Sequence, residues 1–167
     1  LETLSVVTGK SLTGHDVEKA ANAWIVNLED PEDEQHRRIL AACKAVNIDP
    51  DSIKDRLFIH SGNDDRIVVA RETREGVIAE PVVDNMIAEI QRNDIKLRVV
   101  DPFVRCHAVR ENDNDAIDTG MSQFSEIAME TECAVLLVHH TGKTAGRDIV
   151  GDPDAGRGAS SLVWGAR

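Results

Sequence analysis

Two short stretches of the sequence decide the fold: Ala23-Trp24-Ile25-Val26-Asn27-Leu28-Glu29-Asp30-Pro31 and Leu97-Arg98-Val99-Val100-Asp101-Pro102. Each is an apolar run that ends in a carboxylate followed by a proline. Continuous apolar runs of this kind are typical of parallel strands that are buried on both faces. Such strands deliver their last residues to the carboxyl edge of the sheet, where open α/β folds bind ligands. We therefore expect Glu29 and Asp101 at one sheet edge, where two acids suit a shared Mg²⁺ and the hydrolysis of a nucleoside triphosphate.

Strand and helix patterns alternate along the chain, and this alternation predicts an α/β fold with a mostly parallel sheet flanked by helices. Apolar runs predict strands at residues 23–28, 56–60, 97–100 and 134–138. Helical periodicity predicts helices over residues 31–47, 82–90 and 121–132, after a first helix that ends at Thr8-Gly9. Residues 67–70 and 77–79 predict a small inserted β-hairpin, and residues 103–118 and 141–158 predict loops.

Length and composition limit the classes of protein. At 167 residues, the chain is expected to form one domain over residues 1–167. A net charge of −11 and an aromatic content of 3% exclude nucleic-acid binding by the bulk field or by a broad stacking surface, so any such contact must be local. Cys43, Cys106 and Cys133 show no CxxC spacing and predict reduced thiols. The apolar runs are too short to span a bilayer and no export signal opens the chain, so we expect a cytoplasmic protein without membrane contact.

Acidic and histidine side chains at strand ends are the candidates for phosphoryl chemistry. Glu29 is placed to polarise a water molecule, although an acid at a helix start has the same pattern. Asp101 ends an apolar strand in the Walker B form, in which the carboxylate orients Mg²⁺. His139 and His140 follow the strand at 134–138, and one of them is placed to hydrogen-bond a γ-phosphate. A partly buried histidine bonded to a backbone carbonyl is an equal alternative.

Basic residues near the end of the chain are weaker candidates. Arg157 and Arg167 are placed to act as arginine fingers that reach a neighbouring subunit's nucleotide. Lys143 and Arg147 lie in the predicted 141–158 loop, where they are placed to contact a nucleic-acid backbone. For each of the four, taken alone, a solvated surface charge is the favoured interpretation.

Two short motifs are excluded by their context. Gly9-Lys10-Ser11 resembles the end of a phosphate-binding loop, but GxxxxGK[ST] requires glycine at position 4, which is Leu4, and no strand precedes it. Asp113 and Asp115 resemble the start of a calcium-binding loop, but the required glycine and closing glutamate are absent.

Taken in order, several segments resemble the RepA-like branch of the RecA-fold ATPases, which includes plasmid hexameric replicative helicases and related phage or chromosomal AAA-type ATPases. The segments are Asn27–Glu34, His36–Arg38, Val99–Phe103, Glu111–Asn114, Val135–Thr141 and Arg157–Ser161. The resemblance covers essentially the whole chain, and the combination of motifs is specific although no single motif is. It implies a RecA-like P-loop NTPase core that uses Mg²⁺ and ATP and works on single-stranded DNA as a homo-oligomeric ring hexamer.

The resemblance also implies roles for individual residues. Glu29 is similar to the catalytic glutamate, Asp101 to the Walker B aspartate, and His140 or its neighbour His139 to the γ-phosphate sensor. Arg157, or less surely Arg167, is similar to the arginine finger at the subunit interface. The 141–158 segment, with Lys143 and Arg147, is similar to the loop that faces DNA in the hexamer channel.

The sequence departs from this family at its start. In the family, a strand and a glycine-rich GK[ST] loop precede the helix with which this sequence begins. We therefore expect a domain that is truncated at both ends, lacks the Walker A strand and loop, and has weak or no activity. We also expect the strand at 134–138 to form an open sheet edge, through which the chain dimerises or associates with other copies.

Three functions stay open at this point. The first is an ATP-dependent DNA helicase or translocase in plasmid or phage replication. The second is a non-catalytic interaction module derived from such an ATPase. The third is a metal-dependent hydrolase that uses Glu29, Asp101 and His140, for which recognisable ligand spacing is missing.

Overall fold

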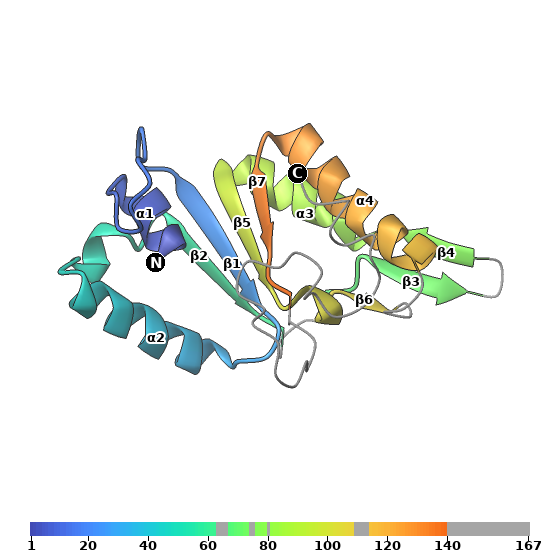
Figure 1. The fold of residues 1–167 in the computed structure, drawn as a ribbon, viewed down its shortest axis with the longest axis horizontal. Coiled ribbons are helices and arrows are strands. Elements are labelled where there is room, and N and C mark those ends of the chain that lie inside the picture. The colour runs from blue at the N-terminus through green and yellow to red at the C-terminus, as the bar shows by residue number, and fades with distance from the viewer. Residues whose placement is uncertain (63–66, 74–75, 80, 109–113, 140–167) are drawn as a thin grey trace, which may run out of the picture.

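The chain is an α/β protein, as the alternating sequence pattern predicts. The computed structural model describes residues 1–62, 67–73, 76–79, 81–108 and 114–139. Their elements, in chain order, are α1 (Glu2–Thr8), β1 (Asn22–Asn27), α2 (Glu32–Ala45), η1 (Pro50–Ser52), β2 (Leu57–Ser61), β3 (Ala70–Thr73), β4 (Gly76–Ala79), α3 (Val82–Arg92), β5 (Ile95–Asp101), η2 (Phe103–Arg105), β6 (His107–Ala108), α4 (Asn114–Thr131) and β7 (Ala134–Leu137) (Figure 1).

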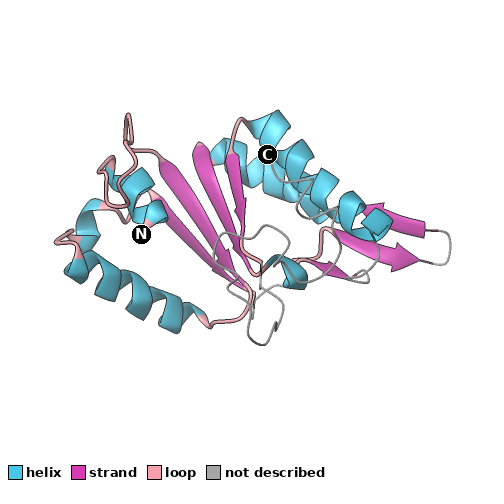
Figure 2. Ribbon diagram, viewed as in Figure 1, coloured by secondary structure: helices cyan, strands magenta, loops and turns pink. Residues whose placement is uncertain are grey.

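The main sheet is parallel and has four strands in the order β2-β1-β5-β7. Figure 2 shows these strands side by side between two groups of helices. Strand β1 lies in the interior, paired with β2 on one side and with β5 on the other. Strand β7 pairs with β5, and in the part of the chain that the structure describes no strand pairs with its other edge. The expected open edge is therefore present among these residues.

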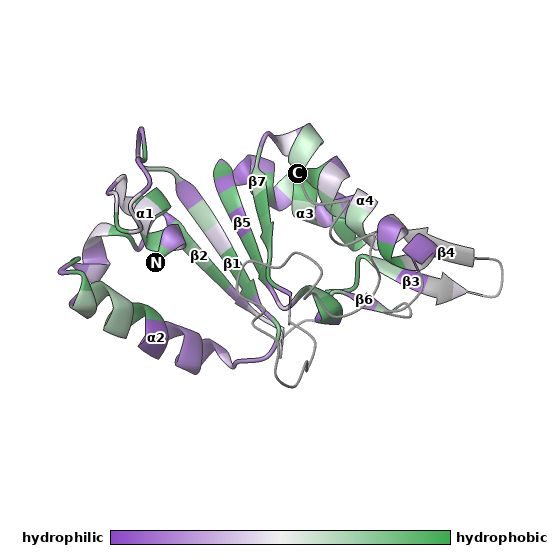
Figure 3. Cartoon of the chain, in the orientation of Figure 1, coloured by the Kyte–Doolittle hydropathy of each residue, from purple (hydrophilic) through white to green (hydrophobic). Residues whose placement is uncertain are grey.

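Each face of the main sheet supports its own apolar core, because successive side chains of a strand point to opposite faces. On one face, Ala23 and Leu97 pack with Leu4 and Val7 of α1 and with Cys43 of α2. Figure 3 shows the apolar second half of α2 lying toward α1, whereas its charged first half lies toward the carboxyl ends of the strands. The two helices therefore cover this face.

The opposite face packs against α3 and α4. Val26 and Val100 of the sheet contact a cluster that includes Met86 and Ile90 of α3 and Phe124 of α4. A second, three-stranded sheet in the order β4-β3-β6 lies beside α4 and away from the main sheet (Figure 1). The predicted hairpin is thus confirmed as β3 and β4, but β3 begins at Ala70 rather than Ile67. Ile67 and Val69 are instead buried in the core.

The expected loop over residues 103–118 is wrong in part. Phe103–Arg105 forms the short helix η2, and α4 begins at Asn114 rather than at Met121. The reason is that buried Ile117 extends the apolar stripe of Met121 and Phe124 by one turn. Asn114 and Asp115 therefore belong to a helix start and not to a loop.

Among the residues that the structure describes, every helix falls short of the length and hydrophobicity that a membrane span requires.

Gly62 marks a close approach between the ends of β1 and β2. Its N–H donates to Asn27 O at 2.9 Å, and an added Cβ would lie 2.8 Å from Leu28 Cα. A contact this short with backbone forces the two strand ends apart. In contrast, a Cβ added at Gly120 within α4 would meet only Phe103 Cζ, at an ordinary 3.8 Å.

The different surroundings of these two glycines predict that a glycine-to-alanine substitution has opposite effects on the free energy of unfolding at the two positions. Gly62→Ala is expected to lower the free energy of unfolding by about 1–3 kcal/mol, the usual cost of overpacking. Gly120→Ala is expected to raise it by about 0.5–1 kcal/mol, because alanine loses less backbone entropy in a helix. Urea unfolding of the two variants measures both. Equal effects of the two substitutions would contradict the close approach at Gly62.

Candidate active site

The pairing of β1 with β5 brings the two predicted acids to the same edge of the sheet. Asn27 lies opposite Asp101 in the strand register, and Leu28 N–H donates to Asp101 O at 2.7 Å. Half-buried Asp101 is the last residue of β5, and its peptide bond to Pro102 is cis. Glu29 follows β1 after one intervening residue and is exposed. The sequence-based expectation of a shared carboxyl edge is met by the strand register.

The backbone that carries Glu29 is fixed by Asn27. Asn27 Oδ1 accepts hydrogen bonds from the N–H groups of Glu29, at 2.9 Å, and of Asp30, at 2.7 Å. Its Nδ2 donates to Asp30 Oδ2 at 3.2 Å. An asparagine that bonds the backbone two residues onward forms a local turn in this way. Asn27 therefore sets the direction in which Glu29 leaves the strand.

Asp30 connects this turn to the neighbouring elements. Its carbonyl oxygen accepts hydrogen bonds from Ser61 Oγ, at 3.1 Å, and Gln35 Nε2, at 3.2 Å. Its carboxylate pairs with Arg38 Nη1 at 2.7 Å. Strand β2 and helix α2 therefore both hold the turn, and Glu29 projects from a rigid support rather than from a free loop.

Arg105 is a site residue that the sequence analysis missed. Its Nε lies 3.3 Å from Glu29 Oε1, and the two side chains are 58% and 42% exposed. The pair spans from η2 to the end of β1, which are distant in the sequence. In the sequence, its position two residues after the Val99–Phe103 motif was the one feature that pointed to a role in the site, and that stretch was predicted to be a loop. An arginine at this distance orients the Glu29 carboxylate, although the exposed pair adds little stability.

The end of β7 completes the edge. Val138 N–H donates to Val100 O at 2.9 Å, and Phe103 N–H donates to Val138 O at 2.8 Å. These bonds continue the β5–β7 pairing past Asp101 and place half-buried His139 beside η2. The ring centroids of His139 and Phe103 lie 6.5 Å apart. His139 thus reaches the same edge as Glu29 and Asp101.

The remaining predicted site residues lie outside the described part of the chain. They are His140, Lys143, Arg147, Arg157 and Arg167. The exclusion of Gly9-Lys10-Ser11 agrees with its placement, because Gly9 ends α1 with a left-handed φ of 68°. These three residues follow a helix instead of leading from a strand into one.

The donor set at the edge fits Mg²⁺ better than a metal held by protein ligands alone. Magnesium takes oxygen ligands and is typically bound through one or two carboxylates together with substrate phosphates and water. Glu29 and Asp101 supply such carboxylates. Within the described ranges, no group of three or more His, Cys, Asp or Glu side chains gathers to hold a metal ion. A zinc-type site therefore has no support among these residues.

A mostly parallel sheet, covered by helices on both faces and carrying acids where its strands end, is the architecture of RecA-like α/β domains. The sequence model of the AAA domain family matches residues 2–146, and the chain therefore belongs to this family of AAA-type ATPases. Such ATPases generally depend on nucleotide and Mg²⁺. A comparison with curated proteins gives no match.

The Asn27 turn generates a prediction. Asn27→Ala removes the acceptor for two backbone N–H groups and is expected to lower the free energy of unfolding by about 1–2 kcal/mol. Asn27→Ser offers a hydroxyl acceptor to the same N–H groups without adding a charge beside Asp30, and it is expected to recover part of the loss. Chemical denaturation of the two variants measures the difference. Equal destabilisation by alanine and serine would show that the turn does not depend on an oxygen acceptor at position 27.

Proposed function

We propose that this chain is the ATPase domain of an ATP-dependent DNA helicase or translocase of the RepA-like kind, acting in plasmid or phage DNA replication. The observation that supports the proposal is the convergence of Glu29, Asp101 and His139 at one carboxyl edge of a parallel sheet. Membership of the AAA domain family supports the hydrolysis of a nucleoside triphosphate. The helicase role rests on the resemblance of the motifs.

In this proposal the two acids divide the chemistry. Asp101, at the end of β5, would hold Mg²⁺, which neutralises charge on the phosphates when bound. Glu29 would orient the attacking water and accept its proton. The Asn27 turn fixes the Glu29 backbone, and Arg105 holds its carboxylate at 3.3 Å. Arg105 therefore acts as a positioning residue for Glu29.

The proposal also assigns the residues that complete catalysis and DNA contact. His139 or His140 would hydrogen-bond the γ-phosphate. Arg157 or Arg167 would stabilise transition-state charge in a neighbouring subunit. Lys143 and Arg147 would contact the phosphates of single-stranded DNA. Only His139 of these lies in the described part of the chain.

A second candidate function, an interaction module, is favoured by the edge of β7. Ala134 is exposed and Leu136 is 38% exposed, and the described residues offer no strand to cover this edge. An open edge with apolar side chains is a template for pairing with another strand. Homo-oligomerisation through this edge stays a prediction. It is compatible with the ATPase proposal because such ATPases work as rings.

The proposal predicts hydrolysis that depends on both acids. Glu29→Gln and Asp101→Asn are each expected to lower the rate of Mg²⁺-dependent ATP hydrolysis, measured with single-stranded DNA present, by about 100-fold or more. Both substitutions keep the size of the side chain. Matched controls are Glu126→Gln and Asp118→Asn, which make the same changes at exposed positions of α4 and should leave the rate unchanged.

The outcomes separate the parts of the proposal. The unmodified chain is expected to hydrolyse ATP only weakly, so the comparison with the variants carries the test. An undiminished rate in both edge variants would contradict the catalytic assignment. Hydrolysis that needs both acids but ignores single-stranded DNA would contradict only the helicase role.

A further inference from the structure

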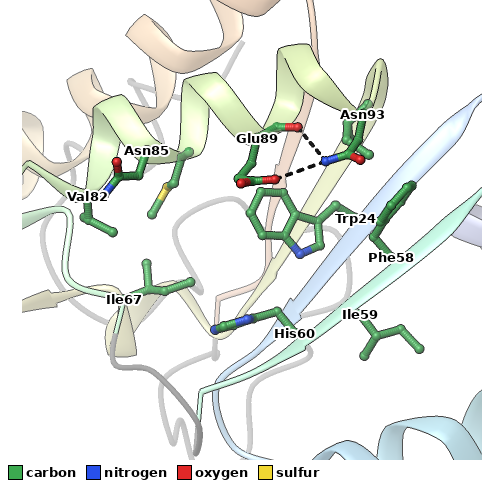
Figure 4. Close-up of a pocket in the computed structure, with 11 residues that line it drawn as sticks. Trp24, Phe58, Ile59, His60, Ile67, Val82, Asn85, Glu89 and Asn93 are labelled. Carbon is green, nitrogen blue, oxygen red and sulfur yellow. Dashed lines mark hydrogen bonds between the residues drawn. The ribbon is translucent and has the colours of Figure 1, made fainter.

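A pocket of about 640 Å³ lies between the α3 face of the main sheet and helix α3, next to strand β2. Trp24 of β1 and Phe58 of β2 line it from the sheet, and Asn85 and Glu89 line it from α3 (Figure 4). Its volume is in the range of about 300–1,000 Å³ that is typical of small-molecule sites. Glu29 and Asp101 do not line it. The pocket is therefore separate from the candidate active site, and a ligand site here does not depend on the proposed function.

The sheet side of the pocket offers aromatic surface. Trp24 and Phe58 are both half-buried, and they come from adjacent strands at paired positions of the register. Two partly exposed rings at paired positions give the pocket an aromatic wall against which a planar ligand can pack. Such a wall favours a flat ring over a branched aliphatic group.

The helix side offers an acceptor that is already held in place. Glu89 Oε1 accepts from Arg92 Nη1 at 2.7 Å, and Oε2 accepts from Asn93 Nδ2 at 3.1 Å. A carboxylate has about four acceptor sites, so two hydrogen bonds leave it able to accept more. Figure 4 shows the Glu89 carboxylate pointing toward the Trp24 ring. A ligand stacked on Trp24 would thus meet an acceptor at its rim.

His60 adds a polar group at the strand end of the pocket. Its Nε2 is buried, and among the described residues it has no hydrogen-bond partner. A buried polar atom without a partner is costly. This favours a polar occupant of the pocket over a purely apolar one.

The positive charge of Arg98 favours a neutral over a cationic ring as the ligand of this pocket. Its guanidinium carbon lies 4.3 Å from the centroid of the Trp24 ring, and the side chain is 0% exposed. None of its three guanidinium nitrogens has a hydrogen-bond partner within the described residues. Burial lowers the pKa of Arg98 to about 10, so the group is still charged at neutral pH. Arg98 does not line the pocket, so its charge acts from behind the ring.

A buried cation that has no hydrogen-bonded partner among the described residues lies beside Trp24 and changes which ligand the exposed part of the indole ring attracts. The guanidinium already uses the negative π-face of the indole, and it repels a second positive charge nearby. A cationic ligand is therefore disfavoured although Glu89 is close. A neutral, electron-rich ring with an N–H donor avoids repulsion by the Arg98 guanidinium and can donate a hydrogen bond to the Glu89 carboxylate.

We propose that this pocket binds a neutral nucleobase, or a similar planar heteroaromatic ring with an exocyclic amino group. The ring would stack on Trp24 and Phe58, and its amino group would donate to Glu89. The site would take a free base, nucleoside or exposed nucleotide base independently of the acids at the sheet edge.

Tryptophan fluorescence tests the proposal directly. The chain has two tryptophans, so Trp164→Phe leaves Trp24 as the only reporter. Adenosine is the probe, and purine riboside, which lacks the amino group, is its matched partner. Adenosine is expected to quench Trp24 saturably with a Kd of about 1 mM or below, and purine riboside is expected to bind more weakly.

Variants then assign the contacts. Glu89→Gln is expected to weaken adenosine binding by about fivefold to tenfold, the loss of a charge-assisted hydrogen bond, while leaving purine riboside nearly unchanged. Glu126→Gln makes the same change at an exposed position of α4 and should alter neither affinity.

Arg98→Met supplies the sharpest comparison, with benzamidine as a flat cationic probe. With Arg98 present, benzamidine is expected to bind more weakly than adenosine. With methionine at this position, the preference should shift toward benzamidine by at least about threefold, because the opposing charge is gone.

Three results would overturn the proposal. They are no saturable quenching up to about 10 mM adenosine, a preference for benzamidine while Arg98 is present, and equal effects of Glu89→Gln and Glu126→Gln.

Discussion

The parallel pairing of β1 with β5 is the constraint on which the rest of the structure depends. It sets Asn27 opposite Asp101 and joins Leu28 N–H to Asp101 O at 2.7 Å. A shift of one residue would turn every side chain of β1 to the other face of the sheet. Ala23 would leave the core under α1, and Val26 would leave the core under α3 and α4. The same register that builds both cores therefore also brings Glu29 and Asp101 to one edge.

The centre of that pairing contains an unusual charge. Arg98 pairs with Trp24 in the register and is completely buried between Leu97 and Val99 of β5. Buried Cys106 and Cys133 do not neutralise it, because burial raises the pKa of both thiols, that of Cys106 to about 12, and keeps them uncharged at neutral pH. The contact with the Trp24 ring offsets only part of the desolvation cost. The buried charge of Arg98 thus contributes to the electrostatic potential of the pocket between the main sheet and α3.

The sequence predicted the features that depend on local pattern. Apolar runs located β1, β2, β5 and β7, and glycine and proline located helix ends such as Gly9 and the start of α2. The early start of α4 was missed because Ile117 stands in a polar stretch, where one apolar residue gives no period. Arg105 and the Trp24–Glu89 pocket were missed for a different reason. Their partners are distant in the sequence, and only the strand register and the helix packing bring them together.

The central claim is that Asp101 and Glu29 form a metal–nucleotide site at the carboxyl edge. Substituting paramagnetic Mn²⁺ for Mg²⁺ in amide NMR spectra tests it most directly. With a non-hydrolysable ATP analogue, Mn²⁺ should broaden the signals of Leu28, Glu29 and Asp101, and Asp101→Ala should remove that broadening. If these signals stay sharp, the edge is not the metal–nucleotide site. If the broadening persists unchanged in Asp101→Ala, Asp101 does not hold the metal, and either result contradicts the account.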